Sequence, residues 1–536
     1  SAHIRRLGLL AIPQQMIPFV KQGLQETGVS VPWHYNRAQL QALLSLKEDD
    51  RLFPVVISNF GCGPDAFSHK YVEEAARSRP LLILEFDEHR GEAGLITRLE
   101  AFLDEIDAHV AKLDRLPPRF PGNVEVAAGR YKGRRIVLPY FADHAYAYQG
   151  ALRSIGLDAV VLPPPDEDTI RFGEEVSTGK ECHPYVLLAG DLFKALERGT
   201  IGSDDVYFFP GTSTPCLMHQ YASSIRMEMK RRGVKGVELL DPKQSELPEL
   251  LGIPGLLRLG RGLLGVELIT RLHSQMRPYV EHAVELDARV QRAYTLLADF
   301  LAVDRQGDAL AWLGKEMDRF PMDRRTLRPL VGVAGDIYTR IHSFGNQGLF
   351  HRLEDLGLEV WPAPFFTDYA SFGWGREMDW GFEEGRYLDA AGSAFMALRG
   401  EWEMLFLRYH LGRPLERLSE PGYREVIQLA SPYVERNANE TVLLNVAKMV
   451  DFAQRGAHGV INAISSHCML GTVSASLVDR IREDHDQLPM LTLIFSATQS
   501  ATMEARLEAF AHQVHARAAS FPREIPRSGW RALFNS

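Results

Sequence analysis

The sequence predicts an α/β protein whose sheets are largely parallel. Short apolar runs of strand length alternate with helical patterns through most of the 536 residues, which is typical of strands joined by helical crossovers. Turn-rich loops follow several of these strands and lead directly into helices. These observations indicate two or more doubly wound, Rossmann-like domains with parallel sheets and a helical insertion.

Residues 1–115 are predicted to form a partial α/β domain. The expected strands are 7–12, 55–59 and 81–86, and the expected helices are 65–78 and 93–106. The segment 116–129 follows, and its two proline-containing turns are typical of a linker.

Two further α/β domains are predicted, at 129–250 and 329–536, with a helical segment at 251–328 between them. The first has expected strands beginning at Arg135, Ala159, Val206 and Val237, and an expected helix at 185–196. The second has expected strands beginning at Pro329, Leu358, Gly459 and Met490. An aromatic- and Met-rich stretch at 370–415 is expected to be the helical insertion, with the side chains of Trp374–Met404 in its core.

An internal repeat accompanies this division. The run Leu82–Phe86 and the residues Arg-Leu-Glu-Ala-Phe at 98–102 are echoed by Leu491–Phe495 and the same five residues at 506–510. Cys62 precedes the first copy by 36 residues and Cys468 precedes the second by 38. We therefore expect a duplication, with residues 1–115 as the tail of a repeat unit in a naturally longer chain.

Composition limits the classes of function. The net charge of −9 without a basic stripe argues against nucleic acid as a partner. No apolar run is long enough to span a bilayer and no secretory signal opens the sequence. Four widely spaced cysteines do not make a disulfide framework. A cytoplasmic protein without membrane contact is expected.

The four cysteines share one kind of local setting: each lies where a turn-rich loop meets the start of a predicted helix. They are Cys62, Cys182, Cys216 and Cys468. Glycine or proline neighbours allow backbone N–H groups to approach closely, and helix N-termini favour negative charge. Four thiolates gathered there would suit an iron–sulfur cluster. His183 and His467 could replace or support a ligand.

Other interpretations of the cysteines stay open. Buried cysteines often act as small hydrophobic residues. Zinc usually binds closely spaced cysteine pairs, whereas the gaps here are 120, 34 and 252 residues.

Three other motifs are weaker. Gly260–Gly265 matches a dinucleotide glycine pattern but no strand precedes it, and the Gly173–Lys180 loop departs from a phosphate-binding loop. Asp336 is either a ligand contact or a helix N-cap.

Five motifs together resemble the 2-hydroxyacyl-CoA dehydratase and benzoyl-CoA reductase superfamily. They are Asn59-Phe-Gly-Cys-Gly-Pro-Asp-Ala-Phe67, Gly179-Lys-Glu-Cys-His-Pro184, Pro210-Gly-Thr-Ser-Thr-Pro-Cys216, Gly335-Asp-Ile-Tyr-Thr-Arg340 and Ser466-His-Cys-Met-Leu-Gly-Thr472. The resemblance covers nearly the whole chain. It is strongest to the cluster-bearing C-terminal part of large fused acyl-CoA dehydratase activase-related proteins.

The resemblance implies an anaerobic, oxygen-sensitive iron–sulfur oxidoreductase. Cys62, Cys182, Cys216 and Cys468 would hold a 4Fe–4S cluster; a double-cubane cluster needs more cysteines than this chain has. An ATPase activase, separate or fused upstream, would supply low-potential electrons for reduction of a small substrate or a partner. In dehydratases three cysteines hold the cluster and one iron stays open. The alternatives are a cluster-free docking scaffold for an activase and a dehydratase-like lyase. A homodimer is one expected assembly.

Overall fold

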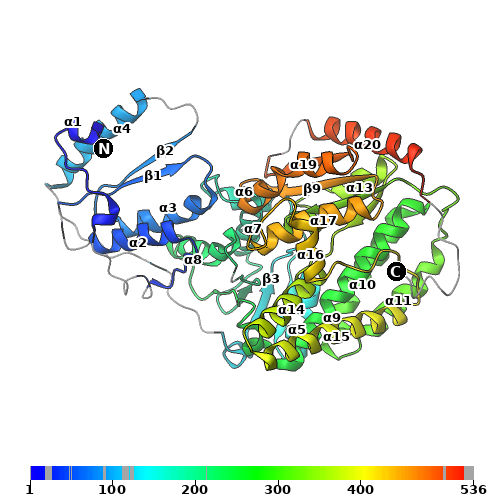
Figure 1. Cartoon of the computed structure of the whole chain (residues 1–536). Helices are drawn as coiled ribbons and strands as arrows, with labels where there is room; N and C mark the ends of the chain where they lie inside the picture. The colour runs from blue at the N-terminus through cyan, green and yellow to red at the C-terminus, as the bar shows by residue number, and fades with distance from the viewer. Residues whose placement is uncertain are drawn as a thin grey trace.

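The computed structural model describes residues 2–17, 24, 27–46, 49, 51–87, 92–110, 120, 126–212, 214–498 and 502–523. In these residues the strands form three sheets, and every strand pair is parallel. The prediction of an α/β protein with parallel sheets is therefore confirmed (Figure 1). Most of the predicted linker 116–129 lies outside the described residues, and the predicted domain boundaries stay predictions.

The N-terminal unit contains a two-stranded sheet. Strand β1 (Val55–Asn59) pairs with β2 (Leu82–Phe86), with Val55 opposite Leu82 and Asn59 opposite Phe86. Its helices are α1 (Ala2–Arg6), α2 (His34–Ser45), α3 (Gly63–Ala75) and α4 (Glu92–Val110). The expected strand at 7–12 is wrong: Leu10 is 79% exposed, and no strand of the described residues pairs with this apolar run. A lone apolar run without a sheet partner does not form a strand.

The second sheet has the strand order β4-β3-β5-β6. Its strands are β3 (Arg135–Leu138), β4 (Asp158–Val161), β5 (Val206–Phe208) and β6 (Glu238–Leu240). Its helices are α5 (Ala145–Ser154), α6 (Glu167–Glu174), α7 (His183–Glu197) and α8 (Tyr221–Arg231). Side chains alternate between two cores: Ile136 and Phe208 lie in the core that includes α5, whereas Val137 and Tyr207 lie in the core that includes α7 and α8. Apolar residues therefore cover both faces of this sheet.

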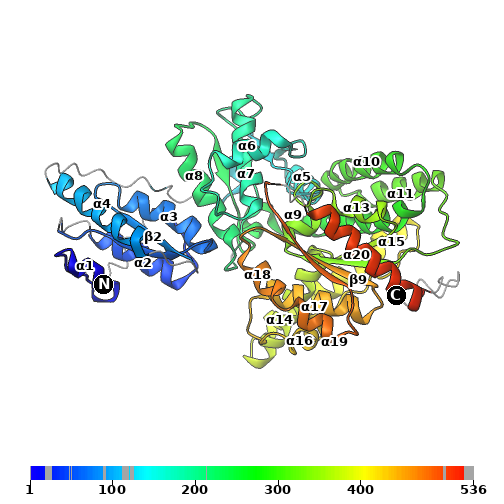
Figure 2. The ribbon, with the colours of Figure 1, turned by 90° about the horizontal axis from the view of Figure 1, so that it is seen from above.

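The third sheet repeats that topology in the order β10-β9-β7-β8. Its strands are β7 (Leu330–Gly335), β8 (Glu359–Pro362), β9 (Gly459–Ser465) and β10 (Met490–Phe495). Helices α16 (Tyr423–Ala430) and α17 (Glu440–Gln454) share a core with one face. Helices α13 (Leu349–Asp355) and α20 (Met503–Ser520) share a core with the other, so α17 and α20 lie on opposite sides in Figure 2. The shorter helices of this unit are α12 (Ile337–Ile341), α18 (Met469–Ala475) and α19 (Val478–Asp484).

Helices α9 (Leu247–Met276), α10 (Ala283–Ala302) and α11 (Gln306–Glu316) form the expected helical segment. The glycine-rich stretch Gly260–Gly265 lies inside α9, so it is no strand-to-helix phosphate loop. The insertion consists of α14 (Phe366–Glu383) and α15 (Tyr387–Leu411). Short 3₁₀ helices are η1 (Gln14–Met16), η4 (Ala128–Tyr131), η5 (Leu217–Gln220), η6 (Arg277–Tyr279) and η7 (Met317–Arg319).

The expectation that the aromatic residues of the insertion form a core is wrong for one face of α15. Phe395 is 63% exposed and Trp402 is 58% exposed, whereas Leu407 on the opposite face is buried. Helical periodicity in the sequence identifies both apolar faces but does not say which of them another helix covers.

The two copies of the sequence repeat fold alike. Arg98 in α4 donates a hydrogen bond to the carbonyl of Ile83 in β2 at 2.7 Å, and Arg506 in α20 donates to that of Thr492 in β10 at 2.7 Å. Phe102 and Phe510 are both buried. These matched contacts support the predicted duplication.

Among the helices of the described residues, none is both long and apolar enough to cross a membrane.

Candidate functional site: four cysteines at helix N-termini

Each of the four cysteines is the N-cap residue of a helix, as the sequence predicted. Cys62 precedes α3, Cys182 precedes α7, Cys216 precedes η5 and Cys468 precedes α18. Proline in the first turn of α3 and of α7 suits this position, because the N–H group that it lacks would have no partner within the helix. Each of these helix N-termini, with its free N–H groups, therefore begins at a cysteine.

Backbone N–H groups act on three of these sulfurs, and within the described residues only Cys468 accepts a capping hydrogen bond from its own helix. The N–H of Gly471 lies 3.2 Å from Cys468 Sγ. Backbone hydrogen bonds from Leu217 and Met218 act on Cys216, and one from Asp65 acts on Cys62. Such donors stabilise a thiolate over a thiol and would also stabilise the charge of a thiolate-bound cluster.

Three of the thiols lie near one another: Cys182 is buried, and Cys216 and Cys468 are half-buried. Burial raises the pKa of Cys182 well above its usual value, and the nearby Cys468 and Cys216 raise it further. Cys182 Sγ also lies 2.6 Å from the hydroxyl oxygen of Tyr221. Burial is likewise the first cause of the raised pKa values of Cys216 and Cys468, followed by the carboxylate of Asp336 for Cys468. In the folded chain these thiols are therefore protonated near neutral pH unless a metal replaces the proton.

Cys62 approaches this region through its neighbour rather than through its own sulfur. A Cβ atom on Gly63 would lie 2.8 Å from Leu217 Cδ1 and 3.2 Å from the carbonyl oxygen of His467. Leu217 follows Cys216 and His467 precedes Cys468, so the absence of a side chain at Gly63 lets three cysteine loops meet. Burial raises the pKa of Cys62, and Asp65 is the charged residue that acts on it.

The four cysteines suit an iron–sulfur cluster because thiolates are its usual ligands and because they lie at helix N-termini. Their sulfur atoms are not arranged as a preformed ligand set in this structure. Within the described residues, no three or more Cys, His, Asp and Glu side chains are grouped as a metal site. Cys182, Cys216 and Cys468 would hold such a group and Cys62 would approach from the side. Binding would draw the loops together, and thiolate would replace thiol.

Replacing Gly63 by Ala is expected to weaken the packing of the Cys62 loop against Leu217 and His467. The added methyl group must displace Leu217 and approach the His467 carbonyl, and we expect the free energy of unfolding in urea to fall by about 1 kcal/mol. Gly94→Ala in α4 is the matched control, because a Cβ there meets no atom within 4 Å. Equal or greater stability of the Gly63→Ala protein would contradict this packing.

The two histidines beside the cysteines differ. His183 is buried, its Nδ1 has no hydrogen-bond partner among the described residues, and burial lowers its pKa to about 4. His467 is exposed and has φ of +58°, a left-handed conformation that is uncommon for a residue with a side chain. Neither is among the groups that act on the pKa values of the four thiols.

Asp336 joins the carboxyl ends of β7 and β9. It is the N-cap of α12, as one of its two interpretations predicted, and accepts the N–H of Thr339 at 2.9 Å. It also accepts the N–H of Ser465 at 2.5 Å. Burial raises its pKa, yet hydrogen bonds from two neighbours, Thr339 and Ser465, act to lower it. Asp336 therefore holds the ends of β7 and β9 together, and its carboxylate lies near enough to Cys468 and Cys216 to raise their pKa values.

A cavity of about 220 Å³ lies at the carboxyl ends of β3, β7 and β8. The sequence did not predict this cavity. Tyr140, Asp143 and His144 enter it from the loop after β3, and Glu267 and Arg271 enter it from α9. Ala142 in this loop has φ of +91°, a strained conformation for a residue other than glycine. The position of Asp143-His144 directly after the predicted strand at Arg135 was the signal available in the sequence.

His144 has no hydrogen-bond partner for either ring nitrogen among the described residues, although it is buried. Burial and then the nearby Arg340 lower its pKa to about 3, so the ring is neutral at pH 7. Arg340 also lines the cavity and its Nε has no partner. A buried polar group without a partner costs free energy, which binding of a polar ligand would offset.

Glu267 is expected to make the stability of the protein depend on pH. Burial raises its pKa from 4.5 to about 7, so the folded state binds a proton that the unfolded state has released between these values. The stability that protonated Glu267 contributes to the folded state is fully present below about pH 4.5. It is lost as pH rises through about 7. Relative to the unaltered protein, Glu267→Gln should therefore be more favourable for stability at pH 8 than at pH 4.5. The difference between the two effects on the free energy of unfolding should be about 1–3 kcal/mol.

Urea unfolding at both pH values checks this expectation. Glu249→Gln is the matched control, since Glu249 is exposed on the same helix. An equal effect of Glu267→Gln at the two pH values would contradict the assignment.

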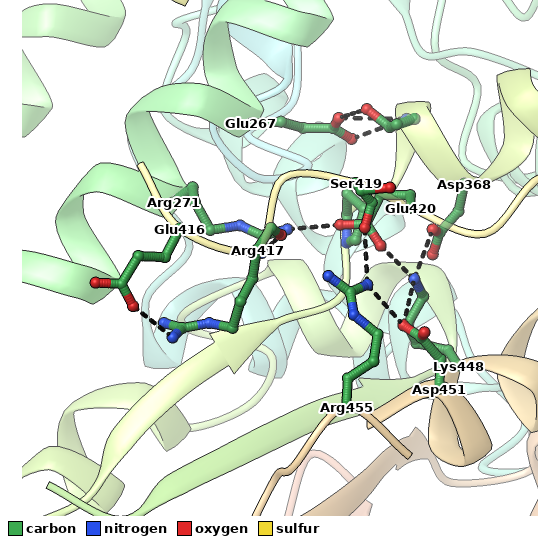
Figure 3. A network of polar contacts seen from close by, with 12 residues as sticks. Glu267, Arg271, Asp368, Glu416, Arg417, Ser419, Glu420, Lys448, Asp451 and Arg455 are labelled. Atoms are coloured by element: carbon green, nitrogen blue, oxygen red, sulfur yellow. Dashed lines mark hydrogen bonds and ion pairs between the residues drawn. The ribbon is translucent and has the colours of Figure 1, made fainter. Parts of the chain in front are cut away.

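A buried network of charges supports the wall of the cavity (Figure 3). Lys448 of α17 contacts Asp368 at 3.2 Å, Asp451 at 3.6 Å and Glu420. Glu420 in turn accepts a hydrogen bond from the cavity residue Arg271 at 2.8 Å. The network thus joins α9, α14 and α17 across the interior, and Glu267 caps the start of α14 by accepting the N–H of Thr367 at 3.2 Å.

Comparison with known proteins finds no family model that matches this chain and no curated protein that is similar to it.

Proposed function

We propose that this chain is an iron–sulfur reductase or electron-transfer component in which Cys62, Cys182, Cys216 and Cys468 hold one 4Fe–4S cluster. The observation that carries the proposal is that all four cysteines occupy helix N-cap positions and that Cys182, Cys216 and Cys468 lie near one another. When bound, such a cluster supplies one-electron transfer. Each helix N-terminus would favour its added negative charge by about 0.3–1 kcal/mol.

The proposed electron donor is an ATP-dependent activase, separate or fused upstream. This part of the proposal depends on the resemblance of five motifs to the 2-hydroxyacyl-CoA dehydratase and benzoyl-CoA reductase superfamily. Four of these motifs contain a cysteine and one contains Asp336. The two larger α/β units are proposed to be doubly wound, which is supported by their shared strand order and by cores on both faces of each sheet. Cytoplasmic location is part of the same proposal.

The proposed substrate pocket is the cavity at His144. Its volume of about 220 Å³ is below the ~300–1,000 Å³ of pockets for drug-sized ligands, so a small molecule is expected. The neutral His144 ring and the Arg340 Nε both lack partners and could donate to a carbonyl or carboxylate oxygen.

A chain of aromatic rings links the pocket to the cysteine region. His144 packs on Phe365 with ring centroids 5.5 Å apart, and Phe365 packs on Tyr369 at 5.8 Å. Tyr369 and Cys216 border the same apolar core, and Cys216 acts on the pKa of Tyr369. A substrate in the cavity would therefore be separated from the proposed cluster by a short protein layer.

Specific observations favour two alternatives. The position of Cys62 apart from the other three thiols would suit a cluster held by three cysteines with one open iron, as in a dehydratase-like lyase. The raised pKa values of all four thiols and the absence of a preformed metal site in the described residues would suit a cluster-free docking scaffold.

Visible absorption spectroscopy separates the redox proposal from the scaffold. After anaerobic reconstitution with iron and sulfide, the chain should become brown, and dithionite should partly bleach the colour. A colourless protein with unchanged fold would support the scaffold and overturn the proposal.

A further inference from the structure

Helix α15 carries an apolar stripe along its solvent-facing side that no other element of the described residues covers. The stripe consists of Leu388, Phe395, Leu398, Trp402, Leu405 and Tyr409, each between 58% and 89% exposed. The opposite face, with Glu403, Leu407 and Leu411, is buried in the molecule. In Figure 1 the helix runs along the lower edge of the larger lobe. Scattered exposed apolar residues are ordinary, but a continuous stripe of large ones marks an interaction surface.

The spacing of the stripe is that of a coiled coil. Its residues follow one another at intervals of 7, 3, 4, 3 and 4, which is the heptad pattern of a seam that packs against another helix. An amphipathic helix that packs on its own protein needs only one such face, and the buried face of α15 already fulfils that need. The second face is therefore open to a helix from another molecule.

We infer that the stripe is the contact surface of a homodimer, in which α15 of two copies packs antiparallel. The inference is independent of the cysteine site and of the proposed function. A stripe on a twofold axis meets the same stripe, so it provides its own partner. The charges beside the stripe then decide the direction and register of the two helices.

Two charged residues at flanking positions fit one antiparallel register. When Trp402 packs against Leu405 of the second copy, Leu398 packs against Tyr409. The same register places Glu401 beside Arg408 of the second copy, twice across the symmetry axis. Neither Glu401 nor Arg408 has an ion pair or hydrogen bond within the described part of its own chain, so both are available.

Other registers lack this match. Moving the register by one heptad, so that Trp402 meets Leu398, would place Glu401 against Glu401 and Arg399 against Arg399. A parallel arrangement would pair Glu401 with Phe406 and leave Arg408 near Arg413. Like charges that face each other are unfavourable, so the charges select the register that pairs Trp402 with Leu405.

Sedimentation velocity and light scattering of the full chain over a range of concentrations test the inference. We expect twice the mass of one chain. Glu401→Arg and Arg408→Glu should each weaken the dimer about tenfold or more, because two attractive pairs become two repulsive ones. The double variant Glu401→Arg/Arg408→Glu should restore the dimer, since it re-forms both pairs in reversed order. Leu398→Glu should give a monomer.

The control is Val284→Glu on α10, which replaces an isolated apolar residue that is 80% exposed and should leave the dimer unchanged. A monomer at all concentrations would overturn the inference, as would a dimer that tolerates Leu398→Glu. A dimer that the double charge swap fails to restore would overturn the antiparallel register.

Discussion

Replacing Cys182 by Ser is expected to remove most of the iron from the anaerobically reconstituted protein, from about four irons per chain to fewer than about one. Cys182 is the most buried of the four cysteines and interacts with both Cys216 and Cys468. A serine hydroxyl there would be a poor ligand, and the remaining thiols would lack their central partner. Cys216→Ser and Cys468→Ser should cause similar losses.

Cys62→Ser should have a smaller effect, because Cys62 stands apart from the other three thiols. Iron and acid-labile sulfide are measured on each purified variant. Ser224→Ala is the matched control: Ser224 is a buried residue of the same region whose hydroxyl lies 2.9 Å from that of Tyr185, rather than near a cysteine. If Cys182→Ser kept its full iron content while remaining folded, Cys182 would not be a ligand.

Replacing Lys448 by Met is expected to lower the free energy of unfolding by about 3–5 kcal/mol. The ammonium group lies among the carboxylates of Asp368, Glu420 and Asp451, and the side chain is 2% exposed. Burial lowers the pKa of Lys448, and these carboxylates outweigh that effect and raise it. Methionine fills a similar volume but leaves three buried carboxylates with too little positive charge.

Urea unfolding at pH 7 measures the change. The control is Lys315→Met on α11, where the side chain is exposed and the effect should stay within about 0.5 kcal/mol. Arginine partners remain for all three carboxylates: Arg340 for Asp368, Arg271 for Glu420 and Arg455 for Asp451. A loss below about 1 kcal/mol would mean that these arginines alone balance the network.

The sequence was sufficient for most strands and for the setting of the cysteines. The strand at 55–59 matches β1, and the strand beginning at Arg135 matches β3, because β-branched apolar runs bounded by turn residues leave few alternatives. The N-cap positions of Cys62, Cys182 and Cys216 followed from the glycine or proline within two residues of each. These features are local, so one chain segment determines them.

Features that depend on distant contacts were not predictable. Residues 7–12 are apolar like a strand but have no partner strand. The cavity at His144 is formed by loops and helices from three parts of the chain, and no single segment shows it. The exposure of Trp402 depends on which face of α15 packs on α11 and α14. In each case tertiary packing decides between outcomes that local sequence allows equally.

Iron and acid-labile sulfide quantitation on the anaerobically prepared chain, with electron paramagnetic resonance of the dithionite-reduced sample, tests the central claim most directly. We expect about four irons and four sulfides per chain and a reduced-cluster signal, with both lost in Cys182→Ser. Zinc in place of iron, or no metal after careful reconstitution of a folded chain, would contradict it.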